Sequence, residues 1–136
     1  MEEPRPLFEV PDAVSTVCVK QWYDSEGYFV MCLDVVTEHG EDEEWGRFMS
    51  FVREFLRWVA RHRVKYKFIF DLTKLNMWPV NQLHELMQYI KKKQHIIDEY
   101  LHSTTIRMRP GLMETIIRGV FLVFPPRRPL HIECVP

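Results

Sequence analysis

The chain alternates between short apolar runs and longer stretches in which apolar residues recur every three or four positions. Two runs rich in β-branched and aromatic residues, 15–22 and 28–36, flank the polar segment 24–27, which predicts two antiparallel strands joined as a hairpin. A further strand is expected at 65–72. Its centre, Phe68, Ile69 and Phe70, is apolar on both faces, which indicates a central strand covered by helices.

Helical spacing marks three more segments. Apolar residues from Trp45 to Val59 predict the first helix, and Pro79 favours the start of a second helix near Val80 whose apolar stripe extends to Leu101. A third helix is expected at 112–124, with short strands at 104–108 and 130–135. The resulting order, β-β-α-β-α-β-α-β, predicts an α/β fold with a single mixed sheet that begins with a hairpin.

Length and prolines set the expected domain boundaries. The 136 residues, of which 46% are hydrophobic, suit one domain with a real core. Pro4, Pro6 and Pro11 break both helix and central strand, so residues 1–14 are predicted to form an extended arm. Residues 15–136 are predicted to form the single α/β domain.

Charge and cysteine usage narrow the functional class. Lys plus Arg number 18 and Asp plus Glu number 19, so no global charge attracts nucleic acid or an anionic membrane. Cys18, Cys32 and Cys134 show no CxxC spacing and lie in alternating apolar runs, where we expect small buried core residues in a reducing compartment. No secretory signal and no transmembrane length is visible, and a cytoplasmic protein that is not integral to a membrane is predicted.

Two charged segments have simple structural explanations. The acidic run 37–44 surrounds His39 but lacks the ligand spacing of an EF-hand, so we expect a solvated loop that caps the next helix, and no metal site. The basic segment 57–67 interleaves Trp58 and Tyr66, which could stack on bases, but basic residues are favoured at a helix end for local reasons. No nucleic-acid partner is therefore predicted.

Other side chains leave two explanations open. Arg107 and Arg109 precede the third helix and could bind an anion, or they could instead supply a salt bridge to Asp71. Phe51 and Trp58 lie toward the edge of the main apolar face of the first helix, where they either complete the core or form a partner or dimer surface. The sequence holds no GxSxG motif and no HExxH or HxH pair, so no catalytic residues and no cofactor are predicted.

Residues 70–83, FDLTKLNMWPVNQL, resemble the strand, polar turn and helix start of the STAS domain, the fold of bacterial anti-sigma-factor antagonists. The Asp-Ser-Ser-Gly-Leu turn of that family falls on residues 79–83, where only Leu83 matches and Asn81 stands at the phosphoacceptor position. An amide cannot accept a phosphoryl group, so the resemblance implies a binding domain without the phosphoacceptor serine. Thr73, at the end of the strand, is the nearby candidate for modification.

The resemblance implies a non-enzymatic protein-interaction or regulatory domain, whether monomeric or a homodimer. Its expected partner-binding residues are Asn76, Trp78, Asn81 and Gln82. A looser resemblance to the lipid-binding half of CRAL-TRIO (Sec14-like) proteins implies the alternative, a carrier or sensor of a hydrophobic or phospholipid ligand. Residues available to line its pocket are Phe121, Phe124, Met113 and Met87. A closed cavity between sheet and helices would favour the carrier, and a flat patch around Asn81 the interaction domain.

Overall fold

Five strands form one mixed sheet in the computed structural model, which describes residues 5–10, 17–36, 42–75 and 77–136. The strands are β1 (Val17–Tyr23), β2 (Phe29–Val35), β3 (Tyr66–Asp71), β4 (Leu101–Met108) and β5 (Leu130–Cys134). They lie side by side in chain order, with β1 antiparallel to β2 and the other neighbours parallel. The predicted α/β fold with an initial hairpin is confirmed.

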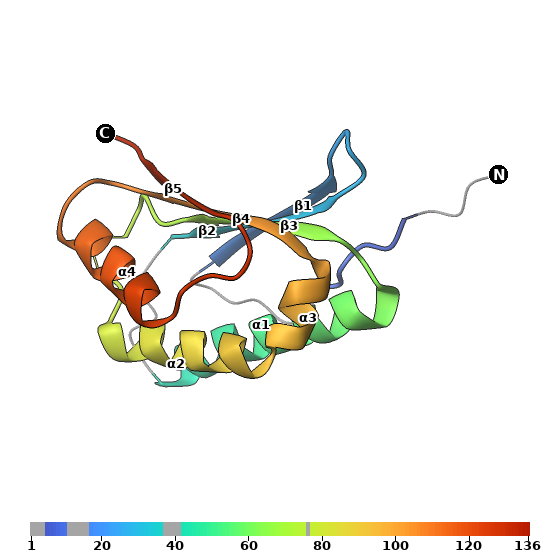
Figure 1. Ribbon diagram of the computed structural model, residues 1–136, viewed down its shortest axis with the longest axis horizontal. Helices are drawn as coiled ribbons and strands as arrows, with labels where there is room; N and C mark the ends of the chain where they lie inside the picture. Colours follow the sequence, from blue (N-terminus) through green and yellow to red (C-terminus); the bar gives the residue numbers. More distant parts are fainter. Residues whose placement is uncertain (1–4, 11–16, 37–41, 76) are drawn as a thin grey trace.

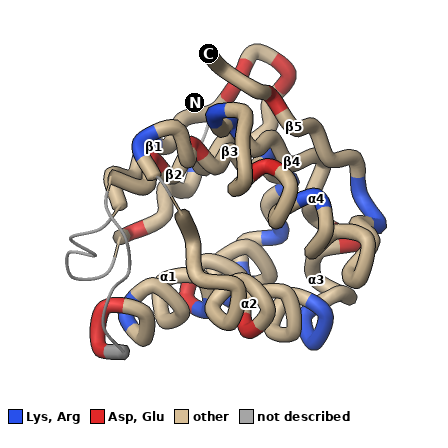
Figure 2. Tube along the Cα trace, turned by 90° about the vertical axis from the view of Figure 1, so that its left-hand side faces the viewer, with Lys and Arg blue, Asp and Glu red and all other residues tan. Residues whose placement is uncertain are grey.

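All four described helices lie on one face of this sheet, as Figures 1 and 2 show from two directions. They are α1 (Asp42–His62), α2 (Val80–Lys92), α3 (Gln94–Tyr100) and α4 (Leu112–Val123). Each crossover adds its parallel strand on the same side of the previous one, and right-handed crossovers in one direction place every helix on the same face. Helices therefore cover β3 on one face only, and the prediction of helices on both faces is wrong.

The uncovered face of the sheet carries a mixed set of side chains. Alternation along the strands places Lys20, Trp22, Ile69 and Thr105 on it, and Trp22 is 43% exposed. Acidic and basic residues are interspersed over the surface of the domain rather than collected on one side (Figure 2). Ile69 is thus a half-buried apolar residue on a sheet face that carries both polar and apolar side chains.

The core lies between the covered face of the sheet and the helices. β2 supplies its centre, since Phe29, Met31, Leu33 and Val35 are all fully buried. The hairpin that leads into β2 turns at Gly27, whose φ of 89° favours glycine, and the Asp24 carboxylate accepts hydrogen bonds from the backbone N–H groups of Glu26 and Tyr28. This turn fixes the register that directs the alternate β2 side chains into the core.

Helix α1 has an apolar face wide enough to contact both the sheet and the arm. Phe51 and Trp58 are buried, and Phe8 of the arm packs edge-on against both rings at 5.7 Å. The arm is held in place by Gln21, whose side chain accepts a hydrogen bond from Phe8 N and donates one to Phe8 O. Of the two alternatives for Phe51 and Trp58, the core role is therefore confirmed, because the arm supplies the surface that covers them.

The predicted second helix is divided in two. It ends at Lys92, a new helix starts at Gln94, and Lys93 between them has φ −102° and ψ 19°. Leu101, expected at the end of this helix, instead begins β4, which is longer than predicted. The element order is consequently β-β-α-β-α-α-β-α-β, with one more helix than the sequence indicates.

The expectation of buried cysteines is only partly met. Cys32 is half-buried, but Cys18 and Cys134 are exposed, and all three are free thiols. Cys18 and Cys134 lie on the two edge strands, and Cys18 faces the uncovered side of the sheet. The burial prediction for these two residues is therefore wrong, because it assumed that both sheet faces and both edges are covered.

Candidate functional site

A cavity of about 470 Å³ lies between the helices and the covered face of β3, β4 and β5. This volume falls within the range of small-molecule sites. Its deep walls are almost entirely apolar and come from the sheet and from all four helices. The buried lining residues are Val52, Phe55, Leu56, Tyr66, Leu72, Trp78, Leu83, Leu86, Ile97, Ile106 and Ile117.

The few polar groups inside the cavity are uncharged. Burial raises the pKa of the Tyr66 phenol above its ordinary value, so this side chain stays protonated at neutral pH. Thr104 of β4 also lines the cavity. Its charged lining residues are Lys91, Arg127 and Arg128, which are exposed or half-buried. Such an interior favours a hydrocarbon group and disfavours a charged one, because a charge buried there would not be paired.

The exposed end of the cavity is formed by the end of α2, by Val123 at the end of α4, and by residues of the following segment, 124–129. Pro125, Pro126 and Pro129 prevent this segment from continuing α4 as a helix. It runs instead from the end of α4 across to β5, between α4 and α3 (Figure 1). The chain thereby forms a strap over the outer end of the cavity, for which we use the name proline strap, residues 124–129.

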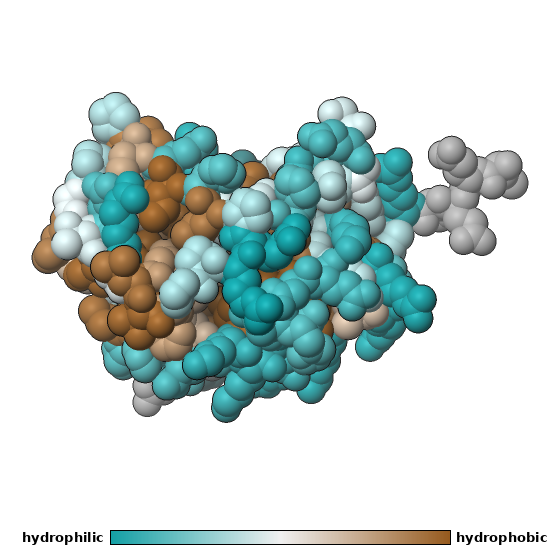
Figure 3. All heavy atoms as spheres, in the orientation of Figure 1, coloured by the Kyte–Doolittle hydropathy of each residue, from teal (hydrophilic) through white to brown (hydrophobic). Residues whose placement is uncertain are grey.

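Two arginines fix the proline strap to neighbouring elements. Arg127 Nη2 lies 3.1 Å from Asp98 Oδ2 on α3, and Arg128 Nε donates a 2.8 Å hydrogen bond to the carbonyl oxygen of Leu101 at the start of β4. Beside the strap, Leu122 and Val123 are 83% and 68% exposed. Figure 3 shows apolar surface gathered over α4 next to hydrophilic atoms. The outer end of the cavity thus combines apolar and basic side chains.

Three of the four residues named for a lipid pocket do line this cavity. They are Met87, Phe121 and Phe124, whereas Met113 is buried elsewhere in the core. Sequence reasoning missed Arg127 and Arg128, although two basic residues among three prolines between a helix and a strand are an unusual composition. It also missed the α1 side chains, because nothing in a single helix pattern tells which elements face it across a cavity.

The three described residues among those predicted for partner binding differ in exposure. Trp78 is buried, with its ring 5.6 Å from that of Phe48 and 6.3 Å from that of Phe70, and it lines the cavity. Asn81 is exposed at the start of α2, Gln82 is half-buried, and Asn76 lies outside the described residues. Trp78 therefore serves the interior of the domain, while Asn81 remains available at its surface.

A polar cluster stands where β3 and β4 end. Arg107 Nη1 lies 3.7 Å from Asp71 Oδ2, and Arg107 Nε lies 3.3 Å from Glu133 Oε2, so the predicted salt bridge is confirmed. Arg109 Nε donates to the Thr73 carbonyl oxygen, and the Thr73 hydroxyl donates to Asp71 at 2.6 Å. Arg107 thus already faces two carboxylates, and the anion-binding and modification roles proposed for these residues stay predictions.

The pKa of Asp71 depends on this cluster. Partial burial raises it, but hydrogen bonds from the side chain and backbone of Thr73, together with the charges of Arg107 and Lys74, lower it below its ordinary value overall. A lowered folded pKa contributes stability above the unfolded pKa of about 3.9, and that contribution is lost as the pH falls through the folded value.

We accordingly expect Asp71→Asn to be less stable than the wild type at pH 7 by on the order of 1 kcal/mol. The gap should narrow at pH 3, because this pH lies below the unfolded pKa of about 3.9, where the stability contributed by the ionised carboxylate begins to be lost. Urea unfolding at the two pH values measures it. A gap that is unchanged at pH 3 would contradict this account of the cluster.

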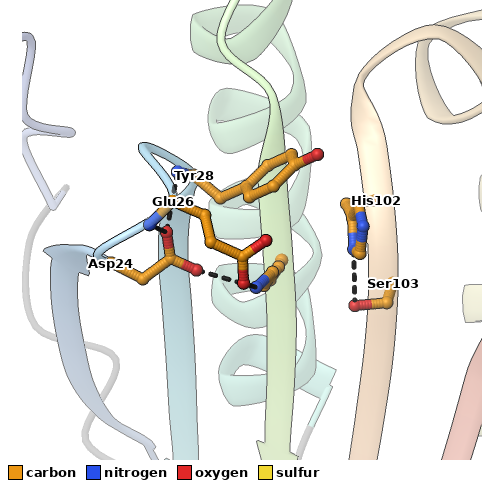
Figure 4. Close-up of polar contacts among 6 residues, drawn as sticks. Asp24, Glu26, Tyr28, His102 and Ser103 are labelled. Atoms are coloured by element: carbon orange, nitrogen blue, oxygen red, sulfur yellow. Dashed lines mark hydrogen bonds and ion pairs between the residues drawn. The ribbon is translucent and has the colours of Figure 1, made fainter.

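A second polar cluster, on the uncovered face of the sheet, was not predicted (Figure 4). Lys67 Nζ lies 2.7 Å from Asp24 Oδ2 and 3.4 Å from Glu26 Oε1, and also 4.9 Å from the centre of the Tyr28 ring. The hydrogen bond from Lys67 lowers the pKa of Asp24. These contacts join the hairpin turn to β3, and we assign them a structural role.

His102 and Ser103 complete the view in Figure 4. His102 Nδ1 lies 3.1 Å from Ser103 Oγ, and the His102 ring centre lies 4.5 Å from that of Tyr28. A nucleophilic serine would need its histidine oriented by a third polar group, whereas the His102 ring packs against the aromatic ring of Tyr28. We therefore assign this pair a packing role, in which His102 of β4 contacts Tyr28, the residue that precedes β2.

Metal and nucleic-acid sites find little support in the described residues. Within them, no group of three or more His, Cys, Asp or Glu side chains is placed to hold a metal ion. The acidic run around His39 lies largely outside the described residues, at 37–41. Trp58 and Tyr66, which could have stacked on bases, are both buried. Among the described helices none is long and apolar enough to span a membrane.

No protein-family model, curated protein or solved structure matches this chain. The likenesses to STAS and to Sec14-like proteins thus rest on the sequence alone, and the cavity is the structural feature that favours a function.

Proposed function

We propose that this domain binds one lipid-like molecule, with its hydrocarbon part in the cavity between the sheet and the helices, and that it acts as a carrier or sensor of that molecule. The observation that carries the proposal is the apolar cavity of about 470 Å³, whose inner lining is buried and uncharged. The transfer of hydrocarbon from water into such a space is favourable by roughly 0.8 kcal/mol of free energy for each buried CH₂ group. A single acyl chain would therefore supply most of the binding free energy.

The strand order supports a site between the layers rather than at the strand ends. Ligands of open α/β sheets bind where the strand order reverses, because the helices on either side of that point leave a crevice. The five described strands here run in sequential order with their helices on one face. The turn that joins β3 to α2 thus lacks the crevice that would make it a binding site. From β3 to α2, Tyr66, Leu72, Trp78 and Leu83 line the cavity instead.

A protein-interaction role through the start of α2 is the second candidate. It is supported by the exposure of Asn81 and of Val80, which is 53% exposed. The two roles are compatible, since a lipid-loaded domain could present this surface to a partner. The cavity is the stronger basis for a proposed function, because side chains from the sheet and from all four described helices line it.

Tryptophan fluorescence offers a test, because Trp78 lines the cavity whereas Trp22 lies on the uncovered face of the sheet. A dibrominated octadecanoate quenches an indole that its chain contacts, and we expect it to quench the protein more strongly than octadecanoate does. Trp78→Phe should bind the probe yet lose most of this difference. Its matched control, Trp22→Phe, should retain it.

Two outcomes would count against the proposal. One is the absence of any extra quenching by the brominated chain in the wild type. The other is a difference that persists in Trp78→Phe and disappears in Trp22→Phe, which would place the chain on the uncovered face.

A further inference from the structure

The charged residues that line the cavity are all basic. They are Lys91, Arg127 and Arg128, and no Asp or Glu is among its described lining residues. The chain as a whole carries 18 Lys and Arg residues and 19 Asp and Glu residues, so the absence of acidic residues from this described lining does not follow from composition. The lining therefore favours a negatively charged group in the ligand.

These basic residues also share one end of the cavity. Lys91 lies in the last turn of α2, and both arginines belong to the proline strap. Lys91 and Arg127 are exposed and Arg128 is half-buried, whereas the opposite end is formed by buried apolar side chains. The cavity therefore has apolar side chains at its inner end and cationic side chains at its outer end, an arrangement that matches the two parts of an amphiphile.

The two guanidinium groups are held in place and keep donors for a ligand. Arg128 uses its Nε–H for the bond to the Leu101 carbonyl oxygen, and Arg127 uses Nη2 in its contact with Asp98. Each guanidinium carries five N–H donors in a planar fork that suits carboxylate or phosphate oxygens. Asp98 also accepts a 2.7 Å hydrogen bond from Gln94 Nε2, so its carboxylate has a second partner besides Arg127.

We infer that the ligand is an anionic amphiphile, whose carboxylate or phosphate head binds Arg127 and Arg128 at the outer end of the cavity while its chain lies inside. This inference rests on the proposed function and names the chemical class of its ligand. Lys91 adds positive charge near the same place. Because the outer end is exposed, the preference for an anion should weaken as salt is raised.

The test compares three ligands with the same chain and different heads. Dodecanoate, dodecyl phosphate and 1-dodecanol are titrated by calorimetry into the wild type, into Arg127→Gln/Arg128→Gln and into the single variant Arg127→Gln. The matched control is Arg53→Gln/Arg57→Gln, which removes two exposed charges from α1, away from the cavity lining. Affinity for dodecanol reports whether each variant retains a folded cavity.

We expect the wild type to bind at least one of the anions about tenfold or more tightly than dodecanol. The double variant should lose that preference while its dodecanol affinity is unchanged, the single variant should lose part of it, and the control should keep it. The stronger of the two anions identifies the head as carboxylate or phosphate.

Equal binding of dodecanol and both anions by the wild type would overturn the inference and leave the proposed function standing. A preference that survives in the double variant would also overturn it, because another group would then hold the head. Failure of all three ligands to bind would instead refute the proposed function.

Discussion

Val120→Trp is expected to raise the dissociation constant of a long-chain ligand at least about tenfold, which corresponds to roughly 1.4 kcal/mol. Val120 lies on α4 and lines the cavity, so an indole at this position would occupy space that the acyl chain needs. The free energy of unfolding should change little, since the larger side chain fills existing space instead of displacing packed atoms. Titration of a fluorescent acyl chain measures the affinity, and urea unfolding measures the stability.

The matched control is Leu122→Trp, two residues further along the same helix. Leu122 is 83% exposed and does not line this cavity, so its replacement should leave the affinity unchanged. Equal affinities of the wild type and Val120→Trp would show that the chain binds somewhere else.

Phe29→Ala is expected to lower the free energy of unfolding by about 3–5 kcal/mol. Phe29 is fully buried on β2, and its ring lies 5.3 Å from that of Tyr23 and 4.9 Å from that of Trp58. Truncation loses the transfer free energy of the ring and leaves a void between the sheet and α1. Because a domain of this size is stable by only about 5–15 kcal/mol, the loss would be a large part of the total.

Chemical denaturation of the purified variant checks this value. Trp22→Ala is the comparison, because Trp22 lies on the same hairpin but points to the uncovered face and is 43% exposed. We expect it to cost less than about 1 kcal/mol. Similar losses in the two variants would mean that the uncovered face is as tightly packed as the covered one, contrary to the fold described above.

Local patterns predicted most of the elements because they depend on neighbouring residues. The hairpin follows from two alternating runs around Gly27, and α1 from the periodic residues between Trp45 and Val59. The break at Lys93 has no comparable local signal, since neither glycine nor proline stands there. After the break, the new helix buries Ile97 in the core, and Leu101 then starts β4.

The one-sided sheet could not be read from any single strand. Phe68, Ile69 and Phe70 suggest a strand with two covered faces, yet which faces are covered depends on the order in which the strands lie. The same limit applies to the cavity, whose walls combine residues far apart in the chain. Pocket residues were partly anticipated on α2 and α4, but Arg127 and Arg128 gain meaning only when the proline strap is seen beside α3.

The central claim is that an acyl chain lies between the sheet and the helices. Isoleucine δ-methyl NMR tests it most directly, because Ile97, Ile106 and Ile117 line the cavity whereas Ile69 lies on the uncovered face of the sheet. With protonated dodecanoate added to methyl-labelled protein, we predict nuclear Overhauser effects from the ligand chain to the methyl groups of Ile97, Ile106 and Ile117, three of the four isoleucines that line the cavity, and none to Ile69. Contacts to Ile69 alone, or to none of these methyl groups under saturating ligand, would contradict the account.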